Sequence, residues 1–147
     1  MSEVVRFAKQ EDTARVVTYL NEARLGTEGV AESIEYFLLM ENEEREVTAT
    51  IGIEPVGKFG LLRSLAISSE LDQEMLLHLF NQALLLAKEK NLSTLLLATN
   101  KPESFAFFQV LGFSVINKAN LPQALLTHNH VQHILSVDNS VFMEMTL

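Results

Sequence analysis

Two hydrophobic periodicities alternate along this chain and predict a mixed α/β fold. Apolar and polar residues alternate over 47–53, which is typical of a strand with one buried face. The segments 61–68 and 92–98 are almost continuously apolar, as is typical of strands covered on both faces. Between them, apolar residues recur at three- and four-residue steps over 71–87, which predicts an amphipathic helix. A strand, a helix and a strand at this spacing predict a right-handed crossover between parallel strands.

Shorter segments complete the predicted fold. A first helix, capped by Asp12 or Thr13, is predicted from apolar positions at Ala14, Val17, Tyr19, Leu20 and Ala23. Further strands are predicted over 4–8, 36–40, 113–116 and 141–145, further helices over 31–34 and 104–111, and a hairpin turn over 55–60. Asn91 is expected to end the long helix in the left-handed conformation, and Gly112 to end the later one. The expected order is β-α-α-β-β-β-α-β-α-β-β. We therefore predict a single α/β (α+β) domain over 1–147, with an antiparallel first half and a mixed, twisted sheet of about seven strands flanked by helices.

Composition excludes several classes of protein. A chain of 147 residues with 48% apolar residues has the length of one domain with a proper core. It has no cysteine, which excludes disulfides, thiolate metal sites and a cysteine nucleophile. Eleven basic residues against nineteen acidic ones give a net charge of −8, and no basic stripe indicates a nucleic-acid partner. No leader pattern and no apolar run near the roughly 18 residues of a membrane span are visible, so we expect a cytoplasmic protein with no membrane partner.

Five short segments occur in a characteristic order. They read GLLRSLAI at 60–67, LLLATN at 95–100, FFQVLGF at 107–113, LPQA at 121–124 and SVFM at 140–143. In this order and spacing they resemble the GNAT superfamily of N-acetyltransferases over essentially the whole chain. Within it, the chain most resembles the arsenic-resistance group, which implies arsinothricin- or phosphinothricin-type substrates.

The resemblance implies where acetyl-CoA would bind. The central strand is implied to splay from its neighbour, so that the backbone of Leu65, Ala66 and Ile67 pairs with the pantetheine arm. Asn100 and Phe108 are implied as further cofactor-binding positions. Family members acetylate a primary amine by direct attack on the thioester, which agrees with the missing cysteine. The implied function is acetyl transfer from acetyl-CoA to the amine of a small amino-acid-like substrate.

The pyrophosphate-binding loop departs from the family pattern R-G-x-G-x-G/A. The matching residues are Asp72, Gln73, Glu74, Met75, Leu76 and Leu77. Glycine lets a backbone approach phosphates at a helix N-terminus, whereas side chains stand in the way here and acidic residues repel an anion. Ser69 and Asp72 also match the spacing of a capping box, with Asp in place of Glu or Gln. We therefore expect this loop to bind acetyl-CoA weakly or not at all.

Two functions of different classes follow from these motifs. The first is an N-acetyltransferase for a small amine. The second is a degenerate family member that has lost acetyl-CoA binding and serves as a non-catalytic binding or regulatory module. The catalytic residue is unassigned, because the position where many members carry a proton-donating Tyr is Phe108. The resemblance also allows a homodimer through the C-terminal strands, although no residue requires one.

Two residues are candidates for substrate binding. Arg63 interrupts an otherwise apolar strand, and it either holds the anionic group of a small acidic substrate or forms an internal salt bridge with Glu54 across the hairpin. Glu28 matches the substrate loop of the family and is otherwise a solvated carboxylate. The histidines over 128–133 are interpreted as a polar surface loop, and no metal site is predicted.

Overall fold

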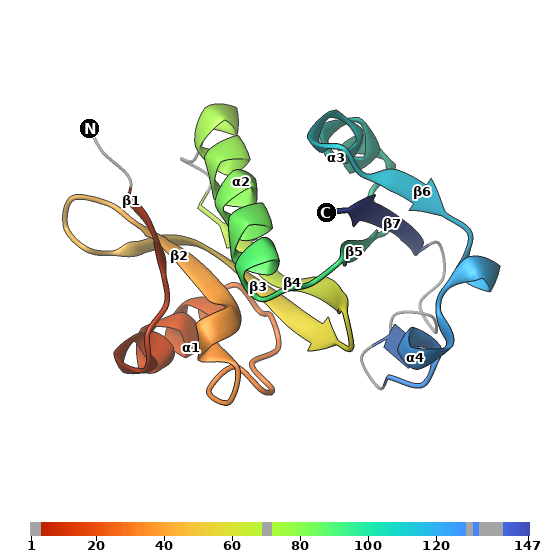
Figure 1. Cartoon of the computed structure of the whole chain (residues 1–147). Coiled ribbons are helices and arrows are strands. Elements are labelled where there is room, and N and C mark those ends of the chain that lie inside the picture. Colours follow the sequence, from red (N-terminus) through yellow and green to blue (C-terminus); the bar gives the residue numbers. More distant parts are fainter. Residues whose placement is uncertain (1–3, 69–71, 129–130, 133–139) are drawn as a thin grey trace. The chain divides into compact units, whose positions relative to one another are not determined.

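The structure is a computed structural model that describes residues 4–68, 72–128, 131–132 and 140–147. Within these residues, seven strands form one mixed sheet in the order β1-β2-β3-β4-β5-β7-β6 (Figure 1). The strands are β1 (Val4–Phe7), β2 (Phe37–Glu41), β3 (Val47–Val56), β4 (Phe59–Ile67), β5 (Thr94–Thr99), β6 (Ser114–Ile116) and β7 (Val141–Thr146). This sheet confirms the predicted fold class. Among the described residues, no helix combines the length and the apolar character that crossing a membrane requires.

The helices confirm the predicted crossover. They are α1 (Thr13–Glu22), α2 (Gln73–Glu89), α3 (Phe105–Leu111) and α4 (Gln123–Leu126), with short 3₁₀ turns η1 (Gln10–Asp12), η2 (Ile34–Tyr36), η3 (Pro102–Ser104) and η4 (Lys118–Asn120). Helix α2 connects β4 to β5, and these two strands are parallel, with Phe59 opposite Thr94 and Leu61 opposite Leu96. The first half of the sheet is antiparallel, as β1 pairs with β2 and β2 with β3 in that sense.

The chain packs as two compact units. The first comprises residues 1–54 and 63–86, and the second comprises residues 55–62 and 87–147. Strand β4 and helix α2 therefore each contribute residues to both units. The second unit has its own core, formed by Leu61, Leu96, Leu121, Leu125, Val131 and Phe142.

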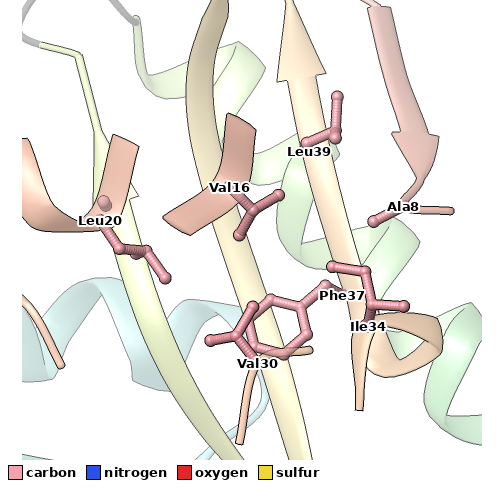
Figure 2. Packing of buried hydrophobic residues seen from close by; sticks show 8 residues of the cluster. Ala8, Val16, Leu20, Val30, Ile34, Phe37 and Leu39 are labelled. Atoms are coloured by element: carbon pink, nitrogen blue, oxygen red, sulfur yellow. The ribbon is translucent and has the colours of Figure 1, made fainter. Parts of the chain in front are cut away.

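The core of the first unit forms where α1 packs on the sheet. Val16 and Leu20, one helical turn apart, point toward Phe37 and Leu39 of β2 (Figure 2). Val30, Ile34, Ala8 and Ala66 complete this cluster. Two residues of the predicted apolar face of α1, Ala14 and Ala23, are exposed rather than buried. Large apolar side chains gain more free energy from burial against the sheet than alanine does, because they remove more apolar area from water.

Strand β3 differs from the half-buried strand that its alternating pattern predicts. Residues 49–53 are all buried, including the small and polar positions. Thr50 is accommodated because its hydroxyl donates a hydrogen bond of 2.9 Å to the carbonyl of Ser64. Gly52 is accommodated because the Phe37 ring occupies the space of a side chain; a Cβ on Gly52 would lie 2.5 Å from Phe37 Cε2. A strand in which apolar residues alternate with small or polar ones, such as β3, can therefore be buried on both faces.

The predicted helix ends were confirmed, whereas the predictions for two connecting segments were wrong. Asn91 has φ of 62° and Gly112 has φ of 115°, so both helices end in the left-handed conformation as predicted. The predicted helix over 31–34 is instead a turn followed by η2. The hairpin turn is shorter than predicted, because Pro55 continues β3, whose extended backbone suits the fixed φ of proline.

An ionic cluster joins the start of α1 to strands β1 and β2. Arg6 donates two hydrogen bonds to the Asp12 carboxylate, at 2.9 and 2.8 Å, and its Nε lies 3.0 Å from Glu41 Oε1. Arg15 Nη2 lies 2.7 Å from Glu41 Oε2. Asp12 is 2% exposed and also accepts the backbone N–H of Lys9 at 2.8 Å. The hydrogen bonds from Arg6 lower the pKa of Asp12 from 3.8 to about 2, and they also lower the pKa of Glu41.

We predict that Asp12→Asn destabilises the protein at neutral pH but not in strong acid. A folded-state pKa below the unfolded value contributes stability that is fully present above pH 3.8 and is lost as the pH falls toward about 2. The free energy of unfolding should fall by about 2 kcal/mol at pH 7, and the difference from the unmodified protein should vanish near pH 2. Urea unfolding between pH 7 and pH 2 measures this. Glu11→Gln, at an exposed neighbouring position, is the control, and an equal loss in both variants would contradict the prediction.

Candidate functional site

The first unit contains a pocket of about 420 Å³ between the end of α1 and the end of β4. It is lined by Tyr19, Glu22, Ala23, Leu25, Leu65, Ala66 and Ile67. The first four come from α1 and the residues that follow it, and the last three are the end of β4. Three of these seven are the residues that the family resemblance assigns to the pantetheine arm.

Helical spacing explains the α1 side of the pocket. Tyr19, Glu22 and Ala23 are three and four residues apart and therefore share one face of the helix. The helix then ends in a Schellman motif: Leu25 N–H bonds to the Leu20 carbonyl at 2.9 Å and Arg24 N–H to the Asn21 carbonyl at 3.0 Å. Arg24 takes the left-handed position, with φ of 61°, where glycine is usual. This turn directs the chain back so that Leu25 lines the pocket.

The β4 side of the pocket follows a break in the extended backbone. Ser64 has φ of 56°, which is rare for a residue with a side chain inside a strand. Its carbonyl accepts the Thr50 hydroxyl and its Oγ accepts Arg63 Nε–H at 3.1 Å. These contacts hold the unusual conformation in place. Leu65, Ala66 and Ile67 follow directly in the chain, so the backbone conformation of Ser64 determines where these three residues lie in the pocket wall.

Tyr19 connects the two sides of the pocket. Its hydroxyl donates a hydrogen bond of 2.8 Å to the carbonyl of Thr48, and the same carbonyl accepts the N–H of Ser68 at 2.8 Å. Burial raises the pKa of Tyr19, and the neighbouring Glu22 carboxylate raises it further. Tyr19 is therefore a neutral phenol at physiological pH, with its proton directed to Thr48. Sequence reasoning missed Tyr19 and Glu22 as site residues, although their spacing on one helix face is visible in the sequence.

The predicted pyrophosphate loop lies at the beginning of α2. Residues 73–77 are helical, and Asp72 is the residue that caps them. Asp72 Oδ1 accepts the N–H of Met75 at 2.8 Å. Asp72 therefore caps the helix that begins at Gln73. Ser69, the first residue of the predicted capping box, lies outside the described residues, so its part in the cap stays a prediction. A helix N–H that a phosphate would use is already bonded to a protein carboxylate.

Arg63 forms the internal salt bridge that the sequence offered as one alternative. Its Nη1 lies 3.6 Å from Glu54 Oε1, and its Nη2 donates to the Glu28 carbonyl at 2.8 Å. The guanidinium also lies over the Phe37 ring, 5.9 Å from its centroid. The structure thus brings Arg63 and Glu28 together, but through the backbone of Glu28, whose side chain is exposed. This geometry favours a structural role for Arg63 over an anion-binding one.

The other predicted site residues belong to the second unit. Phe108 lies on α3 and packs edge-to-face against Phe107 and Phe113, with ring centroids at 5.6 and 6.1 Å. Asn100 follows β5 and is exposed. Their roles toward acetyl-CoA stay predictions. Among the histidines, His130 and His133 lie outside the described residues. Within the part of the chain that the structure describes, no three His, Asp or Glu side chains form a metal site.

Comparison with solved structures defines the class of fold. No family model matches the chain. The N-acetylglutamate synthase of Neisseria gonorrhoeae, complexed with coenzyme A and N-acetyl-glutamate, superposes with a TM-score of 0.79 at 16% identity over 100% of this chain and 35% of that one. A GNAT-family acetyltransferase of Staphylococcus aureus superposes with a TM-score of 0.72 at 17% identity over 99% of both chains. The chain therefore has the GNAT acetyltransferase fold, as the sequence predicted.

One relative is similar along the sequence. The Bacillus subtilis protein YwlB is 29% identical over 141 residues, which is 95% of each chain.

The chain spans only 35% of the Neisseria synthase, so that protein's whole activity does not transfer with the fold. The arsenic-resistance group stays a prediction.

We predict that Arg63→Ala lowers the free energy of unfolding by about 1–3 kcal/mol, because it leaves the Glu28 carbonyl and the Glu54 carboxylate without their guanidinium. Arg63→Lys, which keeps the charge, should recover part of this loss. Urea unfolding measures the effect, with Lys58→Ala at an exposed turn as the control. Unchanged stability together with a raised KM in an acetyl-transfer assay would instead support a substrate role for Arg63.

Proposed function

We propose that this protein transfers an acetyl group from acetyl-CoA to the primary amine of a small molecule. The observation that carries the proposal is the pocket at the end of β4 in a chain with the GNAT fold. Leu65, Ala66 and Ile67 line this pocket, and the family resemblance assigns them to the pantetheine arm. Acetyl-CoA would supply an activated acetyl thioester. Because the chain has no cysteine to take the acetyl group, direct transfer to the amine is the proposed course.

The residues of this chain fit one end of acetyl-CoA better than the other. The strand end beside the pocket suits an acyl-pantetheine arm, since Ile67 is 44% exposed there. The beginning of α2 does not suit a pyrophosphate, because Asp72 already accepts the Met75 N–H and Glu74 adds a second exposed carboxylate. We therefore propose an enzyme that binds its acetyl donor mainly through the acyl-pantetheine end and with low affinity.

The acceptor follows from the pocket rather than from Arg63. The family resemblance implies an amino-acid-like acceptor, and Arg63 was the candidate residue for holding its acidic group. That guanidinium is engaged by Glu54 and the Glu28 carbonyl. The proposal accordingly keeps the primary amine and the small size of the acceptor, without requiring an acidic group.

We expect amine-dependent release of CoA when the protein is incubated with acetyl-CoA and small primary amines. A thiol-reactive dye measures this release without background, because the protein has no thiol of its own. Ala23→Trp fills the pocket from an exposed position and should lower kcat/KM at least tenfold, which corresponds to about 1.4 kcal/mol. Ala14→Trp, at an exposed position of α1 that does not line the pocket, is the matched control. Equal activity of the two variants would contradict the assignment of the pocket.

We further expect a dissociation constant for acetyl-CoA no tighter than about 0.1–1 mM. The loss of two charge-assisted hydrogen bonds from a phosphate-binding loop costs roughly 3–6 kcal/mol. Isothermal titration calorimetry at low salt measures the constant. Asp72→Ser keeps a capping oxygen but removes the charge, and it should tighten binding severalfold. A variant with the family loop, carrying Asp72→Arg, Gln73→Gly, Met75→Gly and Leu77→Gly, should tighten it by at least about tenfold.

The outcomes of this titration separate two claims. A micromolar constant for the unmodified protein would contradict the low-affinity donor site but would leave acetyl transfer intact. No binding by the unmodified protein or either variant would contradict the proposed function itself. Retained circular dichroism shows that the added glycines, each costing about 1 kcal/mol in a helix, have not unfolded α2.

A further inference from the structure

We propose that the pocket of the first unit selects a cationic alkyl- or arylamine that carries no acidic group, with Glu22 and Tyr19 as its recognition residues. The proposal rests on the proposed function, because the bound amine would be the acetyl acceptor. It adds the chemical class of that acceptor and the residues that choose it.

The polar side chains of the pocket wall are hydrogen-bond acceptors. Of the seven lining residues, only Tyr19 and Glu22 have polar side chains. The Tyr19 proton is committed to the Thr48 carbonyl at 2.8 Å, so the phenol offers its oxygen lone pairs to a ligand. A carboxylate group such as that of Glu22 accepts hydrogen bonds through its two oxygens. A ligand that satisfies both must donate, and an ammonium group provides three donors.

The charge of the pocket favours a cation and disfavours an anion. Glu22 is the last residue of α1, where the helix dipole adds partial negative charge. None of the seven lining residues is Lys, Arg or His. Arg24 is exposed and is not part of the lining, and Arg63 is bound to Glu54 and the Glu28 carbonyl. A carboxylate on the ligand would therefore meet Glu22 without a cation to balance it.

The remaining lining residues indicate an apolar body behind the amine. Ala23 and Leu25 form an apolar α1 side for the body of the amine, and Leu65, Ala66 and Ile67 form an apolar wall that this body would share with the acyl end of the donor. Leu25 and Ile67 are 37% and 44% exposed, so a hydrocarbon group in the pocket would remove apolar surface from water. A volume of about 420 Å³ lies toward the small end of ligand pockets, which suits a monoamine with a short chain or one ring.

Two compounds that differ by one carboxylate test the proposal. Phenethylamine and L-phenylalanine share the ring, the spacer and the amine. Each is titrated into ¹⁵N-labelled full-length protein without acetyl-CoA, and amide shifts are followed by NMR. We expect saturable shifts around Tyr19, Glu22 and Ala66 with phenethylamine, and at least about tenfold weaker binding of L-phenylalanine. Equal or tighter binding of L-phenylalanine, or no saturation by phenethylamine in the millimolar range, would overturn the proposal.

Matched variants test the two recognition residues. Glu22→Gln should weaken phenethylamine binding about fivefold, because one contact between unit charges in water-like surroundings is worth about that factor. The ratio of the dissociation constants of L-phenylalanine and phenethylamine should become smaller. Glu11→Gln makes the same charge change next to the other end of α1 and should leave binding unchanged. Tyr19→Phe should weaken phenethylamine binding while the amide spectrum stays dispersed. Equal effects of Glu22→Gln and Glu11→Gln would overturn the role of Glu22.

Amine binding and amine acetylation are measured separately, so each of the two proposals can be refuted without the other. Amine binding as expected, without amine-dependent CoA release, would refute the proposed function and leave the pocket assignment standing. Acetylation of L-phenylalanine at least as fast as phenethylamine would refute the acceptor class and leave acetyl transfer standing.

Discussion

The carbonyl oxygen of Thr48 holds together the two walls of the pocket in the first unit. It accepts the Tyr19 hydroxyl and the Ser68 N–H, both at 2.8 Å, and so ties α1 and the end of β4 to β3. Strand β3 is buried on both faces over 49–53, directly after this carbonyl, which gives the anchor a rigid base. Because Tyr19 and Ile67 line the same pocket, one shared acceptor sets the distance between its two walls.

Two residues in unusual conformations flank this anchor. Arg24 and Ser64 both have positive φ, which costs a residue with a side chain roughly 1–2 kcal/mol. Hydrogen bonds offset that cost: the Schellman motif holds Arg24, and Thr50 and Arg63 hold Ser64. Backbone strain that the surroundings maintain is common at functional sites, because it sets directions that relaxed elements cannot reach. Here it directs Leu25 and Leu65 into the pocket wall.

The beginning of α2 places an acidic cap within an acetyltransferase fold. The sheet order and the crossover are those of a GNAT acetyltransferase, and neighbours with this fold include a protein complexed with coenzyme A. Yet α2 begins with Asp72 bonded to the Met75 N–H. A capping carboxylate occupies a helix N–H and brings negative charge to an end of the helix that otherwise favours anions. Likeness of fold alone therefore does not specify the ligand chemistry of this helix N-terminus.

The sequence by itself determined the elements whose signals are local. The periodicity of α2, the apolar runs of β4 and β5, and the helix ends at Asn91 and Gly112 follow from neighbouring residues. Only the tertiary structure decided the rest. The hydrogen bond from Arg63 to the Glu28 carbonyl, the packing of Gly52 against Phe37, and the meeting of Tyr19 and Glu22 with the end of β4 all join residues far apart in the chain. Such contacts depend on which faces the sheet brings together, and a one-dimensional pattern does not specify that choice.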